Sequence, residues 1–487
     1  MTAVKWIAEG LFVVPLAILF LNNLLPKVTA RRYFCVFAGA AAAVQGLGAV
    51  TELVLFYVYN LRRYEFSVFY GDTVTTDRFC IKISTLFLMA CIGMVAFVSV
   101  MIARKTVSTY RRSYVNLLMC LILGMNGMLL VTDLFSLYVF LEIVGITSFV
   151  MIAMFRSRAG LEGSFKYLVV SAVGVMLLLV GLALLFMQTG SLAFEDISYH
   201  LLRNVDASHR ALTGFAVILM ICGFAVKAGA VPFHSWLPDA HQSADTAVSV
   251  LLSGIVIKVA GIYGLIVIRN MFGSLPAVQL AYRVIGLLSV VVGALLAARQ
   301  NHFKRICAYS SVSQMGYIIL GLSVNTNLGI IGAVAHIFSH AVFKSTLFTN
   351  AAALHEQAGT LDVREMGGLE KQMPVTAFSS VIAFFSTAGI PPCCGFWSKL
   401  LIVLALWKGG AEIWGAAALI ASILTGAYFL RLQKRVFFGK PTEKTAEVKE
   451  IGGTVRFIET ALTAVTIGAG LLFPVALILL QNMGYIA

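Results

Sequence analysis

The sequence predicts an all-α integral membrane protein with about fourteen transmembrane helices. Hydrophobic residues make up 60% of the 487 residues and charged residues only 12%, whereas about a quarter of a soluble globular chain is charged. Apolar runs of about 20 residues, enough to cross a hydrocarbon core about 30 Å thick as a helix, recur along the whole chain. The period-two alternation of a membrane β-barrel is absent, so helices are expected to satisfy the backbone in lipid.

The individual spans follow from apolar runs that end at charged residues or at proline and glycine. Charged residues are concentrated between the runs, so the connecting loops are the parts expected to face water. The runs predict helices near residues 6–25, 33–57, 79–102, 115–131, 134–155, 165–187, 211–236, 246–268, 278–298, 309–324, 329–353, 373–407, 413–438 and 457–483.

The basic residues predict an orientation. With the N-terminus outside, 22 of the 36 Lys and Arg residues fall in cytoplasmic loops and 10 in outer loops. Because positive residues gather on the cytoplasmic side, both termini are predicted on the outer side. The same distribution accounts for the net charge of +14 without a nucleic-acid partner, since the basic residues form no stripe with interleaved aromatics.

Four lysines remain, and all fall inside apolar runs: Lys227, Lys258, Lys344 and Lys399. A charge at mid-membrane costs at least about 2.5–3.5 kcal/mol, so such residues usually serve function. The alternative is that some of them reach an interface with water. Glu142 is the one clearly central acidic residue and is their natural partner. Burial weakens the hold of a lysine on its proton and a nearby carboxylate restores it, so such a pair can act as a proton-carrying switch.

Two other carboxylates are interpreted as structural. Glu52 lies near the outer end of the second span, where solvation is easier. Asp133 is expected to cap the N-terminus of the fifth span, because its short side chain can accept backbone N–H groups.

Two helices are predicted to be broken. Pro232 and Pro238 each remove a backbone hydrogen bond after Lys227, so the seventh span should break near mid-membrane. Broken membrane helices line cavities, and His234 and His241, which follow the break, can relay protons near neutral pH. A second break is expected in the twelfth span, where "GIPPCCG" precedes Lys399.

The two interrupted helices, each beside a lysine, predict two related halves. Helices 4–8 and 9–13 number five each, and an odd number of crossings makes neighbouring halves inverted. We therefore expect three N-terminal helices in 1–114, a first repeat in 115–275, a second, inverted repeat in 276–440, and a cytoplasmic loop with helix 14 in 441–487.

Histidines and a lysine recur at four-residue steps between the breaks. His336, His340 and Lys344 in "HIFSHAVFK" share one helical face. This face is either part of a proton path or a satisfied polar seam between helices. The eight cysteines are scattered without the spacing of a zinc or iron–sulfur site, so packing is their expected role and no redox centre or bound metal is predicted in this chain.

Four stretches between about residues 130 and 400 resemble, in the right order, the antiporter-like subunits of respiratory complex I, of membrane-bound hydrogenases and formate hydrogenlyases, and of multisubunit (Mrp-type) sodium/proton antiporters. These are "DLFSLYVFLE", "KAGAVPFHSWLPDAHQSADTAVSVLLSGIVIK", "HIFSHAVFKSTLF" and "GIPPCCGFWSK". The resemblance implies two inverted five-helix half-channels joined by a hydrophilic axis. Asp245 is a departure, because the family commonly has proline there.

The resemblance also implies roles for single residues. Glu142 would be the acidic member of a pair with Lys227 on the broken seventh helix, and Lys258 the connecting lysine on the eighth. His336, His340 and Lys344 would lead into the second half, and Lys399 would occupy its terminal position.

The function expected first is a subunit that moves protons, or exchanges sodium for protons, within a redox-driven membrane complex. The sequences of these motifs most resemble those of the hydrogenase and sodium/proton antiporter branch of the family. A membrane-bound hydrogenase or formate hydrogenlyase is therefore the expected parent complex. A quinone-reducing complex I, a sodium/proton antiporter, a non-pumping scaffold and an independent substrate transporter are the alternatives. An independent substrate transporter is disfavoured, because it would need a roomy central binding site and the sequence instead places isolated charged residues one after another along the apolar spans.

The partners implied are other membrane subunits and a peripheral redox arm. That arm, and not this chain, would carry iron–sulfur clusters, nickel–iron or flavin and the oxidoreductase activity. The chain itself would lie in the inner (plasma) membrane of a prokaryote, in contact with lipid.

Overall fold

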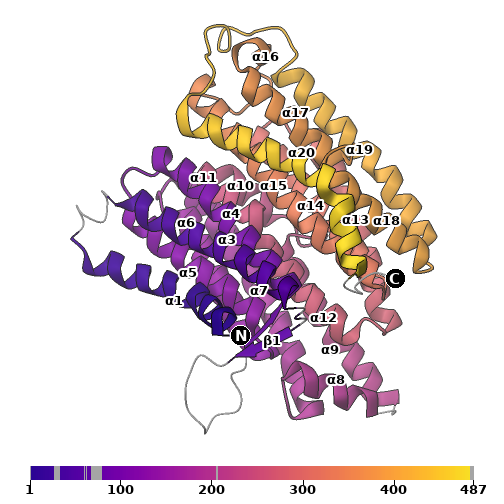
Figure 1. The fold of residues 1–487 in the computed structure, drawn as a ribbon. Coiled ribbons are helices and arrows are strands. Elements are labelled where there is room, and N and C mark those ends of the chain that lie inside the picture. The colour runs from indigo at the N-terminus through magenta and orange to yellow at the C-terminus, as the bar shows by residue number, and fades with distance from the viewer. Residues whose placement is uncertain are drawn as a thin grey trace. The chain divides into compact units, whose positions relative to one another are not determined.

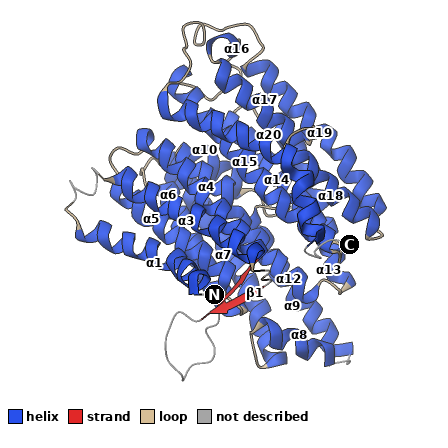
Figure 2. Cartoon of the chain, viewed as in Figure 1, coloured by secondary structure: helices blue, strands red, loops and turns tan. Residues whose placement is uncertain are grey.

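The computed structural model describes residues 2–26, 33–59, 61, 63–66, 79–203 and 207–482, and these are almost entirely helical (Figure 2). Eleven helices in this part of the chain are long and apolar enough to cross a membrane. The all-α membrane class predicted from the sequence is confirmed. The number fourteen and the inverted repeats stay predictions.

The chain forms two compact units, Met1–Lys227 with Ile255–Phe272, and Ala228–Gly254 with Gly273–Ala487. Unit 1 contains α1 (Thr2–Leu24), α3 (Phe34–Val58), α4 (Ile83–Thr106), α5 (Arg111–Leu130), α6 (Leu134–Ala153), α7 (Arg158–Thr189), α8 (Phe194–Arg203), α9 (Ala207–Ala228), the π-helix η2 (Lys258–Tyr263) and α12 (Gly264–Phe272). Unit 2 contains α10 (Trp236–Ser243), α11 (Thr246–Leu251), α13 (Pro276–Arg299), α14 (Phe303–Leu322), α15 (Asn327–Ala358), α16 (Leu369–Gln372), α17 (Pro374–Ala388), α18 (Cys394–Lys408), α19 (Glu412–Val436) and α20 (Gly453–Asn482). A second π-helix, η1 (Leu252–Val256), follows α11 directly.

Unit 1 also holds a short β-hairpin that the sequence did not predict. Strand β1 (Arg63–Phe66) pairs antiparallel with β2 (Phe79–Lys82), with Arg63 opposite Lys82 (Figure 2). The prediction began the third span at residue 79, but α4 begins at Ile83, because the apolar residues before it belong to β2.

Both predicted breaks are present. Helix α9 ends at Ala228, before Pro232, and Gly229 follows with a φ of +66°. Helix α17 ends at Ala388, and Gly389 caps it with a φ of +85°, a left-handed conformation that glycine adopts without steric cost. Non-helical backbone within a membrane-spanning region lines protein or a cavity rather than lipid.

The eighth span differs from the regular helix expected over 246–268. Residues 252–256 and 258–263 are π-helical, and Lys258 opens the second of these segments. π-helical turns are rare and occur frequently at functional sites.

Small residues let helices in unit 2 approach closely. Helices α13 and α14 pack through Gly286, Gly293 and Gly316, and a Cβ atom at Gly316 would lie 2.5 Å from the carbonyl oxygen of Gly286. Close approach at small residues is a principal source of helix packing in membranes. In the same unit, α20 packs against α15, α17 and α18, and Figure 1 shows it as the yellow C-terminal helix.

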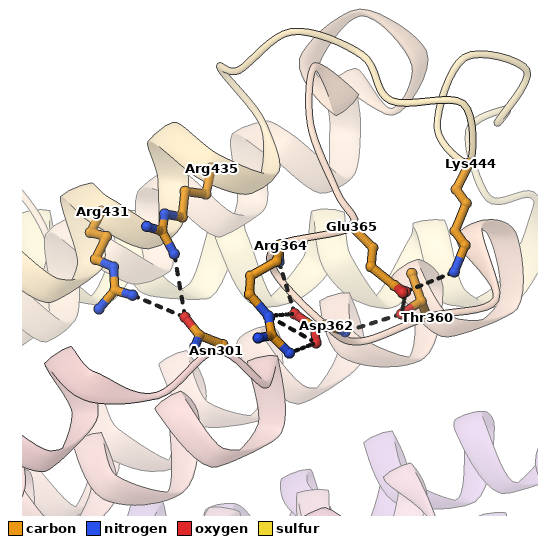
Figure 3. Close-up of polar contacts among 8 residues, drawn as sticks. All are labelled: Asn301, Thr360, Asp362, Arg364, Glu365, Arg431, Arg435 and Lys444. Carbon is orange, nitrogen blue, oxygen red and sulfur yellow. Dashed lines mark hydrogen bonds and ion pairs between the residues drawn. The ribbon is translucent and has the colours of Figure 1, made fainter.

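Polar side chains fix the loops at one end of unit 2 (Figure 3). Asn301 accepts hydrogen bonds from Arg431 and Arg435 at 3.0 and 3.3 Å. The hydrogen bonds that Arg364 donates to Asp362 lower the pKa of this carboxyl to about 2. The same network includes ion pairs or hydrogen bonds of Arg364 with Asp362 at 2.6 Å, of Thr360 with Glu365 at 2.6 Å and of Lys444 with Glu365 at 2.8 Å.

Candidate functional site

In unit 1 the central charges form an ion pair. Lys227 lies near the end of α9, and its Nζ donates to Glu142 Oε1 on α6 at 3.0 Å and to Ser171 Oγ on α7 at 2.7 Å. The Lys227 side chain is only 1% exposed and that of Glu142 is 30% exposed. A Cβ atom at Gly145 would lie 3.1 Å from Lys227 Nζ, so glycine leaves room for the ammonium group. The pairing expected from the sequence is confirmed.

Lys258 is also buried in unit 1, at 1% exposure. It lies at the first position of η2. Five residues further along, the Tyr263 hydroxyl donates to the carbonyl oxygen of Leu129 at 3.1 Å. Tyr263 lines a cavity of about 930 Å³, whose other polar walls include Lys82 and Asp133. The π-helical segment therefore carries a buried lysine at its start and a residue that lines the cavity at its end.

In unit 2 the predicted histidine face is buried. His336 Nδ1 is hydrogen-bonded to Ser398 Oγ at 2.9 Å and its Nε2 to Gln314 Oε1 at 3.2 Å. His340 is 0% exposed, and the Phe343 ring contacts both imidazoles, with its centroid 6.4 Å from that of His336 and 5.1 Å from that of His340.

The two lysines of unit 2 have different surroundings. Lys344 Nζ donates to the carbonyl oxygen of Cys307 at 2.7 Å and to the Ser310 hydroxyl. Lys399 Nζ lies 4.3 Å from the centroid of the Tyr317 ring, a cation–π contact, and has no hydrogen-bond partner among the described residues. The Tyr317 ring is also 6.1 Å from that of His336, so it connects the lysine to the histidine face.

His234 lies in the segment between α9 and α10 and is half-buried. Its ring centroid is 6.2 Å from that of Tyr309. His241, the second histidine after the break, is fully buried, and its ring centroid lies 4.9 Å from that of Phe348 in a stacked arrangement. The interrupted region therefore carries two imidazoles packed against aromatic rings of unit 2.

Two expectations about charged residues were wrong. Glu52 was expected near water, but it is 0% exposed, and neither of its oxygens has a hydrogen-bond partner in the described part of the chain. Lys304 was counted with the loops, but it lies in the first turn of α14 at 5% exposure and donates to the carbonyl oxygen of Ala244 at 2.9 Å. Sequence position relative to an apolar run does not reveal which side of a helix the neighbouring helices cover.

Asp133 and Asp245 cap the N-termini of two helices. Asp133 accepts a hydrogen bond from the backbone N–H of Ser136 at 2.7 Å at the start of α6, as predicted. Asp245, whose role the sequence left open, accepts from the backbone N–H of Ala247 at 2.8 Å at the start of α11. Its carboxylate satisfies a backbone donor that proline at that position would leave without a side-chain acceptor.

The polar partners of the buried lysines and histidines were missed. Ser171, Ser310, Gln314, Tyr317 and Ser398 hydrogen-bond or contact these side chains. Their signal in the sequence is small polar residues within apolar spans, such as the serines in "YSSVSQ", which are common in helices that pack through small residues. Among the described residues, no group of three or more His, Cys, Asp or Glu side chains is placed to hold a metal ion.

Residues 131–425, which include Glu142 and the buried lysines and histidines described above, match the family described as NADH:quinone oxidoreductase/Mrp antiporter, transmembrane. This fold, with its buried lysines, is that of an antiporter-like membrane subunit. The chain belongs to this NADH:quinone oxidoreductase/Mrp antiporter family.

The relatives come from several kinds of complex. The chain is 32% identical to a subunit of the Na(+)/H(+) antiporter of Alkalihalophilus pseudofirmus over 73% of each chain. It is 34% identical to a subunit of the F(420)H(2) dehydrogenase of Methanosarcina mazei over 71% of this chain and 70% of that protein. It is 30% identical to a subunit of the NADH-quinone oxidoreductase of Ruthia magnifica over 79% of this chain and 80% of that protein.

Two solved structures share the fold over almost the whole chain. A chain of the Mrp complex from Dietzia sp. matches with a TM-score of 0.86 at 23% identity, over 98% of this chain and 97% of that one. A chain of the membrane-bound sulfane sulfur reductase, an archaeal respiratory membrane complex, matches with a TM-score of 0.86 at 27% identity over the same shares.

Proposed function

We propose that the chain translocates protons as a subunit of a redox-driven membrane complex of the membrane-bound hydrogenase or formate hydrogenlyase type. The observation that carries this proposal is the Glu142–Lys227 pair, a 3.0 Å ion pair whose lysine is 1% exposed inside an apolar unit. Buried ionisable residues in membrane helices usually mark ion pathways. The relatives from redox complexes support a redox-driven parent.

The pair can work as a switch because its two states differ in charge. With Glu142 ionised and close, Lys227 holds its proton. When the carboxylate moves away or is neutralised, the ammonium loses its counter-charge in a desolvated position and gives up the proton. Ser171 holds the ammonium in place at 2.7 Å. A neighbouring redox arm that changes the charge near Glu142 would drive this exchange.

Each unit carries its own row of protonatable groups. In unit 1 these are Glu142, Lys227 and Lys258, and in unit 2 they are His234, His336, His340, Lys344 and Lys399. We propose that the two rows act in succession, so that protonation in one unit prepares release in the other. The cytoplasmic side would be the side of the basic loops, and both termini would lie outside, in a prokaryotic plasma membrane.

Ion pumping by the intact purified complex in sealed vesicles tests the proposal, with a pH-sensitive dye inside and sodium present or absent. Lys227→Ala is expected to keep electron transfer and to lower the initial rate of ion movement at least about tenfold, equal to about 1.4 kcal/mol in the barrier. Lys166→Ala is the matched control, because Lys166 is exposed and pairs with Glu162 on the surface of α7.

The alternatives give different results in the same assay. Pumping that is unchanged in Lys227→Ala would show that the chain is a non-pumping scaffold. Ion movement that requires sodium would favour sodium/proton exchange, the activity named for the antiporter relative. The electron donor and acceptor that support pumping identify the parent complex. Pumping driven by NADH and quinone would contradict a hydrogenase-type parent and favour a quinone-reducing complex I.

A further inference from the structure

A buried carboxyl group in unit 2 lies apart from the lysines and histidines described above. Glu459 is on α20 and is 0% exposed. Its neighbours are Thr376 on α17, Asn350 on α15, and Glu450 in the loop before α20. No described lysine, arginine or histidine pairs with Glu459 or Glu450. Glu450 is the charged group whose field reaches Glu459 from the elements that pack against it. The protonation states of the two carboxyl groups therefore have to be assigned together.

Both carboxyl groups contact one hydroxyl. Thr376 Oγ1 lies 2.9 Å from Glu450 Oε1 and 3.0 Å from Glu459 Oε2. A hydroxyl has a single proton to donate and lone pairs to accept with. It can donate to one ionised carboxylate but not to two. For both contacts to be hydrogen bonds, one of the two carboxyl groups must be protonated and donate to Thr376.

Glu450 is the ionised member. Its carboxylate accepts the backbone N–H groups of Val375 at 2.6 Å, of Thr376 at 3.4 Å and of its own neighbour Ile451 at 3.0 Å. The first two are donors in the first turn of α17, where the helix dipole favours a negative charge. Glu450 is also partly exposed to solvent. N–H donors, helix dipole and water all favour its charged form.

Glu459 has the surroundings of a neutral acid. The Asn350 side-chain amide satisfies its neighbours when its nitrogen faces Glu459 Oε1, at 2.7 Å. Glu459 Oε1 then accepts one hydrogen bond, as a carbonyl oxygen does. Glu459 Oε2 carries the proton and donates it to Thr376 Oγ1. Each oxygen has one partner of the right kind, and no charge is left unpaired in the interior.

We infer that Glu459 is a protonation site, a buried carboxylic acid that exchanges its proton with water through the Thr376 hydroxyl and the Glu450 carboxylate. When Thr376 passes its own proton to Glu450 Oε1 and takes the Glu459 proton, a proton has moved from the interior to the surface without movement of any heavy atom. We call this route from Glu459 through Thr376 to Glu450 the exchange route. It lies at the end of unit 2 that carries the loops 300–302 and 437–452. It goes beyond the proposed role of the lysines, and its protonation state does not depend on ion pumping.

Infrared difference spectra of the intact complex, recorded in H₂O and D₂O at neutral pH, test this inference. The wild-type protein is expected to show the carbonyl band of a protonated carboxyl group that is lost in Glu459→Gln and retained in Glu443→Gln. Glu443 is an exposed residue of the same loop as Glu450 and serves as the control. Glutamine can accept from Asn350 and donate to Thr376 as the neutral acid does, so Glu459→Gln is expected to fold. Glu52, the other buried carboxyl group described above, keeps its own band in every variant. A carbonyl band in Glu459→Gln as intense as in the wild-type protein would overturn the inference.

Thr376→Val tests the route and does not depend on the folding of the first variant. Valine has nearly the shape of threonine but can neither accept from Glu459 nor donate to Glu450. The acid band is expected to remain, because Glu459 stays buried, and its shift on transfer to D₂O is expected to slow at least about tenfold, equal to about 1.4 kcal/mol in the exchange barrier. Exchange at the wild-type rate would show that the Glu459 proton reaches water without Thr376, and it would refute the exchange route.

Discussion

At the residue scale, what matters for each buried ionisable group is whether its partners complete its hydrogen bonds. Lys227 has a carboxylate and a hydroxyl within 3.0 Å, and Lys344 has a carbonyl oxygen and a hydroxyl. Glu52, by contrast, is buried on α3 with neither oxygen bonded to a described residue. An unsatisfied buried polar group destabilises a fold.

We therefore expect Glu52→Leu to raise the thermal unfolding midpoint in detergent, by an amount equivalent to about 1–3 kcal/mol. Glu52→Gln, which keeps a polar group of the same size in the same place, is the control and should gain much less. The measurement is the unfolding transition of both variants at one pH. A lower midpoint for Glu52→Leu would show that the carboxyl group has a stabilising partner in the assembled protein.

His302 gives the fold a pH dependence that can be assigned to one residue. It precedes α14 beside the polar loops, and burial, with Lys304 and Arg305 nearby, lowers the pKa of its imidazole from 6.5 to about 4. The unfolded chain then binds a proton at a pH at which the folded chain does not. Stability is fully present above pH 6.5 and is lost as the pH falls from 6.5 towards 4.

His302→Gln is expected to flatten the dependence of the unfolding midpoint on pH across this window. His355→Gln, at the exposed end of α15, should leave most of the slope in place. An unaltered slope in His302→Gln would assign the effect to another group.

At the scale of elements, close helix packing makes the effect of replacing a glycine by alanine depend on its position. Gly316→Ala is expected to destabilise unit 2 by about 1–3 kcal/mol, because its Cβ would meet backbone atoms of α13 that cannot move aside. Gly426→Ala, on α19, has open space around the new methyl group and should be neutral or stabilising by up to about 1 kcal/mol, since alanine favours helix. Equal unfolding midpoints for the two variants would contradict this account of the α13–α14 contact.

The helix breaks were predictable because proline and glycine act locally through the backbone. Gly389 adopts a left-handed conformation after α17, and the chain around Pro232 leaves the helix after Ala228. The π-helical segments around Lys258 were not predictable, because their sequence is as apolar and regular as that of an ordinary span. Which hydrogen-bond period such a segment adopts depends on what packs against it.

At the scale of the whole molecule, the proposed function requires both units to work. Lys399→Leu in unit 2 is expected to lower ion movement at least about tenfold, as Lys227→Ala does in unit 1. The same change should not lower the unfolding midpoint, because Lys399 Nζ has no hydrogen-bond partner among the described residues and leucine fits an apolar site. Pumping at the wild-type rate in this variant would exclude unit 2 from the path.

The sequence by itself determined the membrane class, the order of the helices, the two breaks and the role of Glu142 as partner of a buried lysine, and the family resemblance added that this lysine is Lys227. These features follow from local composition and from the cost of charge in lipid, which makes the one central glutamate the expected partner of a buried lysine. Only the tertiary structure decided that Glu52 and Lys304 are buried, that serines and Tyr317 surround the charges, and that Glu459 shares Thr376 with Glu450. Those contacts join helices far apart in the chain, and their geometry depends on which faces the helices present to one another.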